Sequence, residues 1–136
     1  MSSGWKCIAV GDTHSLAIKE NGDLYSWGAG GPALGLGDWK GYLIPTFVSS
    51  GWKSVFANGA YSQALKENGD LYVWGDGIYR QLGLGDASNR FTPTFLSSGW
   101  KIVSPGTNHS LGIKENGNLY VWGSIVTGKQ IGRAHV

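Results

Sequence analysis

One phrase recurs three times along the chain, and its spacing constrains the fold more than any other feature. It reads KENGDLYSWG at Lys19–Gly28, KENGDLYVWG at Lys66–Gly75 and KENGNLYVWG at Lys114–Gly123. The spacing is 47 residues and then 48, and the tripeptide GWK keeps the same step. A fixed period of this size indicates one structural unit copied in tandem. We expect the shared residues to build that unit, and function to depend on the residues that differ between copies.

The composition is that of a folded domain with many turns. Of the 136 residues, 41% are hydrophobic and 15% are charged, which is enough apolar sequence for a core. The 23 glycines recur in register with the repeats, so they indicate turns. The net charge of +2, without a basic run, argues against nucleic-acid binding, and no apolar run is long enough to span a membrane. A single cysteine, Cys7, excludes an intrachain disulfide, and we expect it near the core.

Each copy predicts four short β-strands. In the second copy they fall at Trp52–Ala57, Tyr61–Lys66, Leu71–Trp74 and Pro93–Ser97. The pair Asn68-Gly69 between the second and third strands is typical of a β-hairpin, and we expect a type I′ turn with positive φ at both residues. No segment shows sustained helical periodicity. The predicted fold class is therefore all-β, with one small antiparallel sheet in each copy.

A single sheet of this kind would leave Trp, Tyr and Leu side chains in water. Stacking the copies buries those side chains, and four-stranded sheets stacked by radial repetition are the blades of a β-propeller. We therefore expect a partial β-propeller with about two full four-stranded antiparallel blades, a partial third blade and a ring that is not closed. Such an arc keeps two exposed blade faces, so we expect it to be marginally stable or to self-associate through those faces.

The combined motif resembles the regulator of chromosome condensation repeat family. Its parts are Gly-x-x-His-Ser, Asn-Gly, aromatic-x-Trp-Gly and Leu-Gly-x-Gly, and they occur in Gly11–Gly28 with Leu34–Asp38, in Tyr61–Gly75 with Leu82–Asp86, and in Gly106–Gly123. The second copy departs from the pattern by placing Tyr61 where the others have His. The resemblance covers almost all of residues 4–123 and implies blades of a seven-bladed propeller.

The repeats predict one propeller domain over residues 1–128, divided at about 4–50, 51–98 and 99–128. Met1-Ser-Ser-Gly-Trp aligns with Val48–Trp52 and Leu96–Trp100, so we expect the chain to begin inside a strand of a longer array. The third copy stops matching after Gly123. The final residues from Ile131 resemble a translated sequencing adapter, and we interpret residues 129–136 as a non-native or divergent tail.

Polar residues that repeat are interpreted as structural. His14 and His109 are equivalent and Tyr61 replaces them in the second copy, which argues against metal ligation or base catalysis and favours a hydrogen-bonding role in a turn. Asp38 and Asp86 end the Leu-Gly-Leu-Gly-Asp motif, and we expect them to cap turns because no calcium-loop spacing is present. We expect no catalytic residue, no metal site and no cofactor.

The variable loops carry the candidate contact residues, because Tyr, Trp and Arg are enriched at binding hot spots. The candidates are Trp39, Tyr42, Ile78, Tyr79, Arg80, Asn89 and Arg90. We expect a non-enzymatic module that docks another protein, of unknown identity, through these rim loops. The resemblance leaves two alternatives, a guanine-nucleotide exchange factor for a small GTPase and a propeller-type β-lactamase inhibitor. A hydrolase or lectin site on blades outside this sequence also stays open, and no compartment is indicated.

Overall fold

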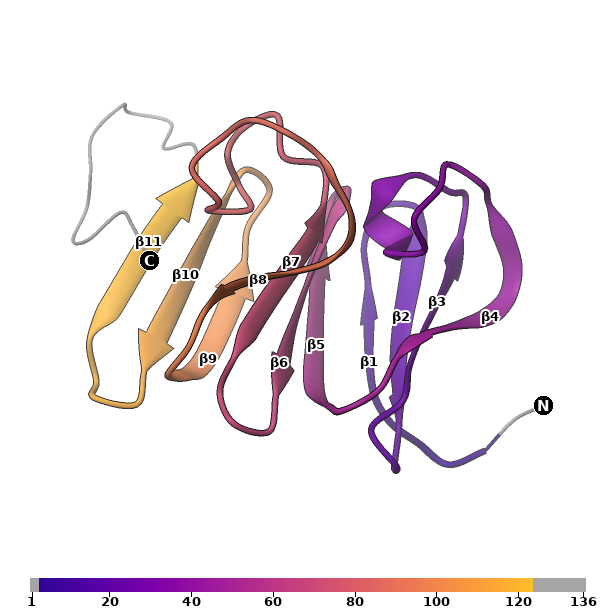
Figure 1. Cartoon of the computed structure of the whole chain (residues 1–136), viewed down its shortest axis with the longest axis horizontal. Helices are drawn as coiled ribbons and strands as arrows, with labels where there is room; N and C mark the ends of the chain where they lie inside the picture. Colours follow the sequence, from indigo (N-terminus) through magenta and orange to yellow (C-terminus); the bar gives the residue numbers. More distant parts are fainter. Residues whose placement is uncertain (1–2, 124–136) are drawn as a thin grey trace.

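Three antiparallel sheets stand side by side in the computed structural model, which describes residues 3–123 (Figure 1). Blade 1 contains β1 (Trp5–Val10), β2 (His14–Lys19), β3 (Leu24–Gly28) and β4 (Tyr42–Ser49). Blade 2 contains β5 (Trp52–Asn58), β6 (Tyr61–Lys66), β7 (Leu71–Gly75) and β8 (Arg90–Ser97). Blade 3 contains β9 (Trp100–Pro105), β10 (His109–Lys114) and β11 (Leu119–Gly123). Within each blade, consecutive strands pair in sequence order.

This architecture confirms the expected all-β fold, a partial propeller with an unclosed ring. The two complete blades have four strands each and the described part of the third has three. Within residues 3–123 the single helical segment is the short 3-10 turn η1 (Pro32–Leu34), which lies between β3 and β4. The tail predicted at residues 129–136, and the end of the third repeat from residue 124, lie outside the described residues.

The Asn-Gly hairpins form where they were expected, but the predicted turn type was wrong. Gly22, Gly69 and Gly117 have positive φ, whereas Arg80 is the one non-glycine residue with positive φ within residues 3–123. A type I′ turn needs positive φ at both central residues, so the Asn residues rule it out. Instead, the Gly22 amide donates to the Lys19 carbonyl, and the Asn21 side chain accepts a hydrogen bond from the Asp23 amide at 3.0 Å. The longer loop lets glycine alone take the left-handed conformation.

Each blade has two faces, and neighbouring blades meet through opposite ones. We call the face toward the next blade in sequence the forward face, and the face toward the preceding blade the rear face. The forward face of blade 1 supplies Leu16, Ile18 and Leu24 to a core that the rear face of blade 2 completes with Trp52, Val55 and Trp74. The second core repeats this plan with Leu65, Leu71 and Val73 of blade 2 and Trp100, Val103 and Trp122 of blade 3.

The Leu-Gly-Leu-Gly-Asp loop is part of the contact between blades. The loop of blade 1 reaches over blade 2, where the Trp74 indole Nε1 donates a 2.9 Å hydrogen bond to the Ala33 carbonyl. Gly35 lies against the same indole, since a Cβ there would sit 2.7 Å from Trp74 Nε1. Gly83 of blade 2 stands in the same relation to Trp122, with 2.6 Å to Cδ1. The motif therefore packs the tryptophan of the following blade.

Hydrogen bonds also join the blades, which corrects the role expected for His14. Its Nε2 lies 2.9 Å from Ser62 Oγ in blade 2. The Ser62 hydroxyl donates to the Ala33 carbonyl, so His14 Nε2–H is the donor to Ser62. The equivalent Tyr61 hydroxyl bonds the Gly106 carbonyl at 2.6 Å in blade 3. This position links successive blades rather than closing a turn, and the partner is 48 residues away in sequence.

Acid is expected to weaken the fold through His14. Burial lowers the pKa of His14 to about 4 from 6.5, while the Asp12 carboxylate acts in the opposite direction. Below pH 6.5 the unfolded chain takes up a proton that the folded chain resists until about pH 4, so stability falls as pH falls through this window. We expect a loss of about 2.5 kcal/mol between pH 7 and pH 4.5.

Urea unfolding at several pH values measures this loss, and His14→Tyr is the matched variant because Tyr61 already occupies the equivalent place in blade 2. The variant should lose most of the pH dependence between pH 6.5 and pH 4.5. An unchanged dependence in His14→Tyr would show that another group carries it.

Candidate functional site

Two long loops lie at the same edge of the fan (Figure 1). The first, residues 29–41, joins β3 to β4, and the second, residues 76–89, joins β7 to β8. We call them the rim loops. All seven predicted contact residues lie in these loops or at the first residue of the strand that follows. Tyr42 is the first residue of β4 and Arg90 is the first residue of β8. The fourth strand of blade 2 thus starts three residues before Pro93, where it was predicted to start.

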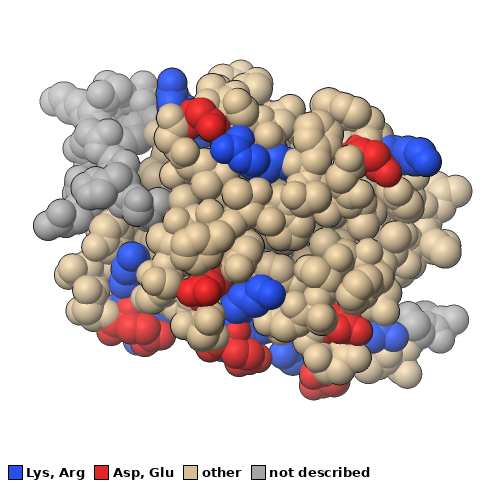
Figure 2. Space-filling model, in the orientation of Figure 1, with Lys and Arg blue, Asp and Glu red and all other residues tan. Residues whose placement is uncertain are grey.

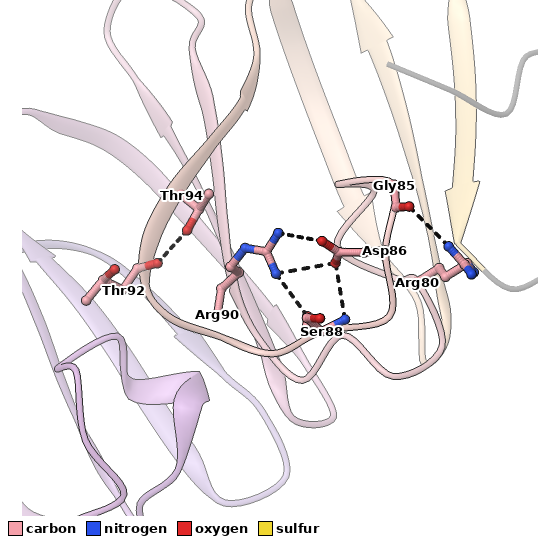
Figure 3. A network of polar contacts seen from close by, with 7 residues as sticks. All are labelled: Arg80, Gly85, Asp86, Ser88, Arg90, Thr92 and Thr94. Carbon is pink, nitrogen blue, oxygen red and sulfur yellow. Dashed lines mark hydrogen bonds and ion pairs between the residues drawn. The ribbon is translucent and has the colours of Figure 1, made fainter.

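Each rim loop is closed by the aspartate of the repeated motif. In blade 2, the Arg90 guanidinium makes a bidentate ion pair with Asp86, at 2.9 Å to Oδ2 and 3.3 Å to Oδ1 (Figure 3). Asp86 Oδ1 also accepts from the Ser88 amide at 3.1 Å, and these contacts, led by Arg90, hold the pKa of Asp86 below its usual value. In blade 1, the Tyr42 hydroxyl donates to Asp38 at 2.9 Å, and this bond raises the pKa of Tyr42.

The expected turn-capping role of these aspartates is thereby confirmed. Asp38 Oδ1 accepts from the Lys40 amide at 3.0 Å, as Asp86 Oδ1 does from the Ser88 amide. Tyr42 and Arg90 are equivalent, since they pair with Gly28 and Gly75 in the strand register. Their polar groups are therefore directed into their own loops. We expect these two side chains to shape the loops more than to reach a partner.

The tip of the second rim loop is exposed but tightly held. Ile78 and Tyr79 are 55% and 50% exposed. The Ile78 amide donates to the Asp76 carboxylate at 3.0 Å, and the Tyr79 amide donates to the Gln81 side chain at 2.8 Å. The Asn89 side chain accepts from the Gly77 amide at 3.1 Å. Side chains of the loop thus fix the backbone of the apolar tip and of Gly77 just before it.

Arg80 follows the tip in a left-handed conformation, with φ of 60°. Its guanidinium donates to the Gly85 carbonyl at 3.2 Å, within the same loop (Figure 3). A left-handed conformation in a residue with a side chain is uncommon and costs energy, so it persists where the surroundings determine it. The Arg80 backbone supplies two of those contacts, because its amide bonds the Gly77 carbonyl and its carbonyl accepts from the Gly83 amide.

The first rim loop is anchored on the neighbouring blade. The Trp39 ring packs edge-on against Phe91 of β8, with centroids 4.9 Å apart. The Gly37 amide donates to the Phe91 carbonyl at 2.9 Å. Trp39 nevertheless stays 67% exposed. Trp39, Ile78 and Tyr79 are therefore the hydrophobic candidates that are at least half exposed. Arg80 is exposed as well, but it bonds a group of its own loop, as Tyr42, Asn89 and Arg90 do.

Charge is sparse between the two edges of the fan. On the face shown in Figure 2, Lys, Arg, Asp and Glu side chains lie along the edge of the rim loops and along the opposite edge, with an uncharged area between them. Residues 3–123 contain no group of three or more His, Cys, Asp or Glu placed to hold a metal ion. In the same range, no helix is long and apolar enough to cross a bilayer.

Sequence reasoning missed two exposed apolar residues beside the first rim loop. Leu43 is 98% exposed and Ile44 is 71% exposed, both on the outer strand β4. The sequence carried a signal for them, because both lie in the variable stretch between Asp38 and Pro45. As exposed residues outside the loops, they also serve as control positions.

Comparisons of the sequence with known proteins identify the repeat family. Two sequence models of the regulator of chromosome condensation (RCC1) repeat match the chain, one over residues 68–113 and the other over residues 5–31. Together they span more than half of the sequence. No curated protein sequence matches the chain.

Several solved structures are similar in fold. Human WBSCR16 superposes with a TM-score of 0.84 and 24% identity, over 97% of this chain and 36% of that one. Prp20p from Saccharomyces cerevisiae, studied for its binding to Gsp1p and histones, gives a TM-score of 0.78 and 26% identity, over 88% of this chain and 33% of that one. Yeast RCC1 (Prp20) bound to Kap60 gives the same score and identity, with 32% of its chain covered. This chain thus spans about a third of the length of these proteins.

Proposed function

We propose that this chain, which belongs to the RCC1 repeat family, is a non-enzymatic protein-binding module. It docks its partner through the rim loops. The observation that carries the proposal is the exposed tip Ile78-Tyr79, whose two backbone amides donate to the side chains of Asp76 and Gln81. An apolar and aromatic tip on a fixed backbone loses little conformational entropy on binding, so less of its contact energy is offset by ordering.

The proposal gives the seven candidates two different tasks. Trp39, Ile78 and Tyr79 make the contact, because they are the exposed large hydrophobic side chains of the rim loops. The polar candidates Tyr42, Arg80, Asn89 and Arg90 position the loops through the bonds described above. Replacing Ile78 or Tyr79 should weaken binding without loss of stability, whereas replacing a positioning residue should loosen the loop. Trp39 has both roles, because its ring also packs against Phe91.

Photo-crosslinking in the source cells tests the contact role. Benzoylphenylalanine at position 79 should crosslink one protein reproducibly, because the Tyr79 side chain is half exposed at the tip. The same group at position 44, on the outer strand β4, is the control, since Ile44 is more exposed but lies outside the rim loops. Identical crosslinks from both positions would contradict a rim-specific partner.

The crosslinked protein then provides an affinity measurement. Ile78→Ser combined with Tyr79→Ser should weaken its binding by about 100-fold or more, because buried hot-spot residues each contribute about 2 kcal/mol or more. Ile44→Ser should leave the affinity within about threefold, as expected for a residue outside the contact. Equal affinities of the double variant and the unaltered chain would remove the tip from the interface.

A small GTPase is the second candidate partner, because one of the similar structures is that of Prp20p, which was studied for binding to Gsp1p. Purified Gsp1p loaded with a fluorescent nucleotide separates the two candidates. Accelerated nucleotide release that Tyr79→Ser abolishes would favour exchange activity through the same rim. Binding without accelerated release would favour the docking module.

A further inference from the structure

The two ends of the fan expose apolar faces whose equivalents are buried in the two interfaces between the described blades. On the forward face of blade 3, Leu111, Ile113 and Leu119 are 40%, 37% and 52% exposed. The equivalent residues on the forward face of blade 1 are Leu16, Ile18 and Leu24, and none is more than 1% exposed because blade 2 covers them. The three exposed residues line a shallow hollow together with Ile102.

The rear face of blade 1 is the other open end. Ile8 and Val10 are 75% and 69% exposed and line a second hollow with Ser15 and Trp27. The residues equivalent to Ile8 are Val55 in blade 2 and Val103 in blade 3, and each is 3% exposed. Trp27 is half-buried, whereas Trp74 and Trp122 at the same repeat position are 0% and 2% exposed. Within residues 3–123, no forward face covers this end.

The two ends also carry the two halves of the hydrogen bond that links neighbouring blades. His14 of blade 1 donates to Ser62 of blade 2. The equivalent His109 is exposed at the forward end, and the equivalent Ser15 lies in the hollow at the rear end. The donor and the acceptor of one further link are therefore present, but on opposite ends of the same chain. Neither open face carries a charged residue among those that line its hollow.

We infer that a second copy of this chain docks end to end, with the forward face of its blade 3 against the rear face of blade 1. The two interfaces inside the chain show that these faces fit one another, since each joins a forward face to a rear face with the same residue positions. The contact is heterologous, because the two surfaces that meet are different. His109 of one copy takes Ser15 of the other as its partner, and Leu119 packs beside Trp27.

Charge reversal at each end tests this arrangement by sedimentation velocity on the full chain over a range of concentrations. Ile8→Glu blocks the rear face and Leu119→Glu blocks the forward face, and both side chains are exposed in the single chain, so both variants should fold. Each variant alone should sediment as one chain, with association weakened at least about 100-fold by a buried unpaired carboxylate. Leu43→Glu, on the outer strand β4, should associate like the unaltered chain.

Mixing the two blocked variants gives the sharpest outcome. The mixture retains one good forward face and one good rear face, so it should form a complex of two chains and nothing larger, while the unaltered chain forms longer assemblies or a ring. Val10→Glu and Ile102→Glu form a second pair if circular dichroism shows that a first variant is unfolded. The inference is overturned if the unaltered chain stays single at all concentrations, or if either blocked variant alone still forms dimers.

Discussion

Replacing Trp74 by alanine should cost about 3–5 kcal/mol of folding stability, the typical loss for a fully buried tryptophan. Trp74 is 0% exposed between blades 1 and 2, and its indole donates to the Ala33 carbonyl. The substitution removes the aromatic surface that joins the two blades and leaves that carbonyl with one partner fewer. Because small domains are stable by only about 5–15 kcal/mol, most of the molecule should be unfolded at moderate urea concentration.

Trp27→Ala is the matched control, because Trp27 holds the same repeat position on the open rear face of blade 1 and is only half-buried. We expect it to cost about 1–2 kcal/mol, in proportion to the smaller apolar area lost. Urea unfolding followed by circular dichroism measures both, at a concentration where the chain is single. Equal losses for the two variants would mean that the tryptophan is needed within each blade and not between blades.

Gly35→Ala should destabilise the fold by about 2–5 kcal/mol, which combines left-handed backbone strain with overpacking. Gly35 has φ of +72°, and a Cβ would stand 2.7 Å from Nε1 of the buried Trp74. Gly37→Ala is the control from the same loop. It carries similar strain, with φ of +87°, but its Cβ would meet only Thr92 Cγ2 at 3.8 Å, so about 1–2 kcal/mol is expected.

The second interface repeats this comparison. Gly83→Ala would bring a Cβ to 2.6 Å from Trp122 Cδ1, whereas Gly85→Ala would meet nothing within 4 Å. We expect Gly83→Ala to be the more damaging of the pair in urea unfolding, and near-ultraviolet circular dichroism should report a changed tryptophan environment in it alone. If all four glycine variants lost the same stability, backbone strain alone would explain the losses. The proposed role of the loop in packing the tryptophan would then be wrong.

The blades were predictable because each strand boundary recurs at a fixed period. Asn68-Gly69 marked the hairpin between β6 and β7, and the tryptophans marked the surfaces that had to be covered. The turn type was not predictable from the dipeptide. The residues that follow Lys66 close a longer loop in which Gly69 alone has positive φ, and the choice between the two turns depends on the register of the whole hairpin.

Contacts between blades could not be predicted from one repeat. His14 and Ser62 are 48 residues apart, and their hydrogen bond depends on how two sheets pack. The sequence shows only that His and Tyr alternate at one position, which is compatible with many partners. Both side chains end in a donor that reaches the following blade, and that geometry is visible only when the blades are stacked.

The division of the rim residues into contact residues and positioning residues could be predicted in part from the sequence. Tyr42 follows Asp38 by four residues, and Arg90 follows Asp86 by the same interval, so a donor after each motif aspartate indicated a loop-closing pair. The exposure of the Ile78-Tyr79 tip could not be predicted from the sequence, because it is set by the backbone path of the loop, which includes the left-handed Arg80. Loop residues of this kind are predicted by chemical type, but their direction is set by backbone geometry.

The central claim is that consecutive repeats pack face to face, with the glycine loop of one blade on the tryptophan of the next. A nuclear Overhauser spectrum of the chain tests it directly. We predict cross-peaks from the Trp74 indole N–H to the α-protons of Gly35, and from the Trp122 indole to those of Gly83, since these groups lie in contact. Indole protons that show cross-peaks only to residues of their own repeat would contradict the stacked arrangement.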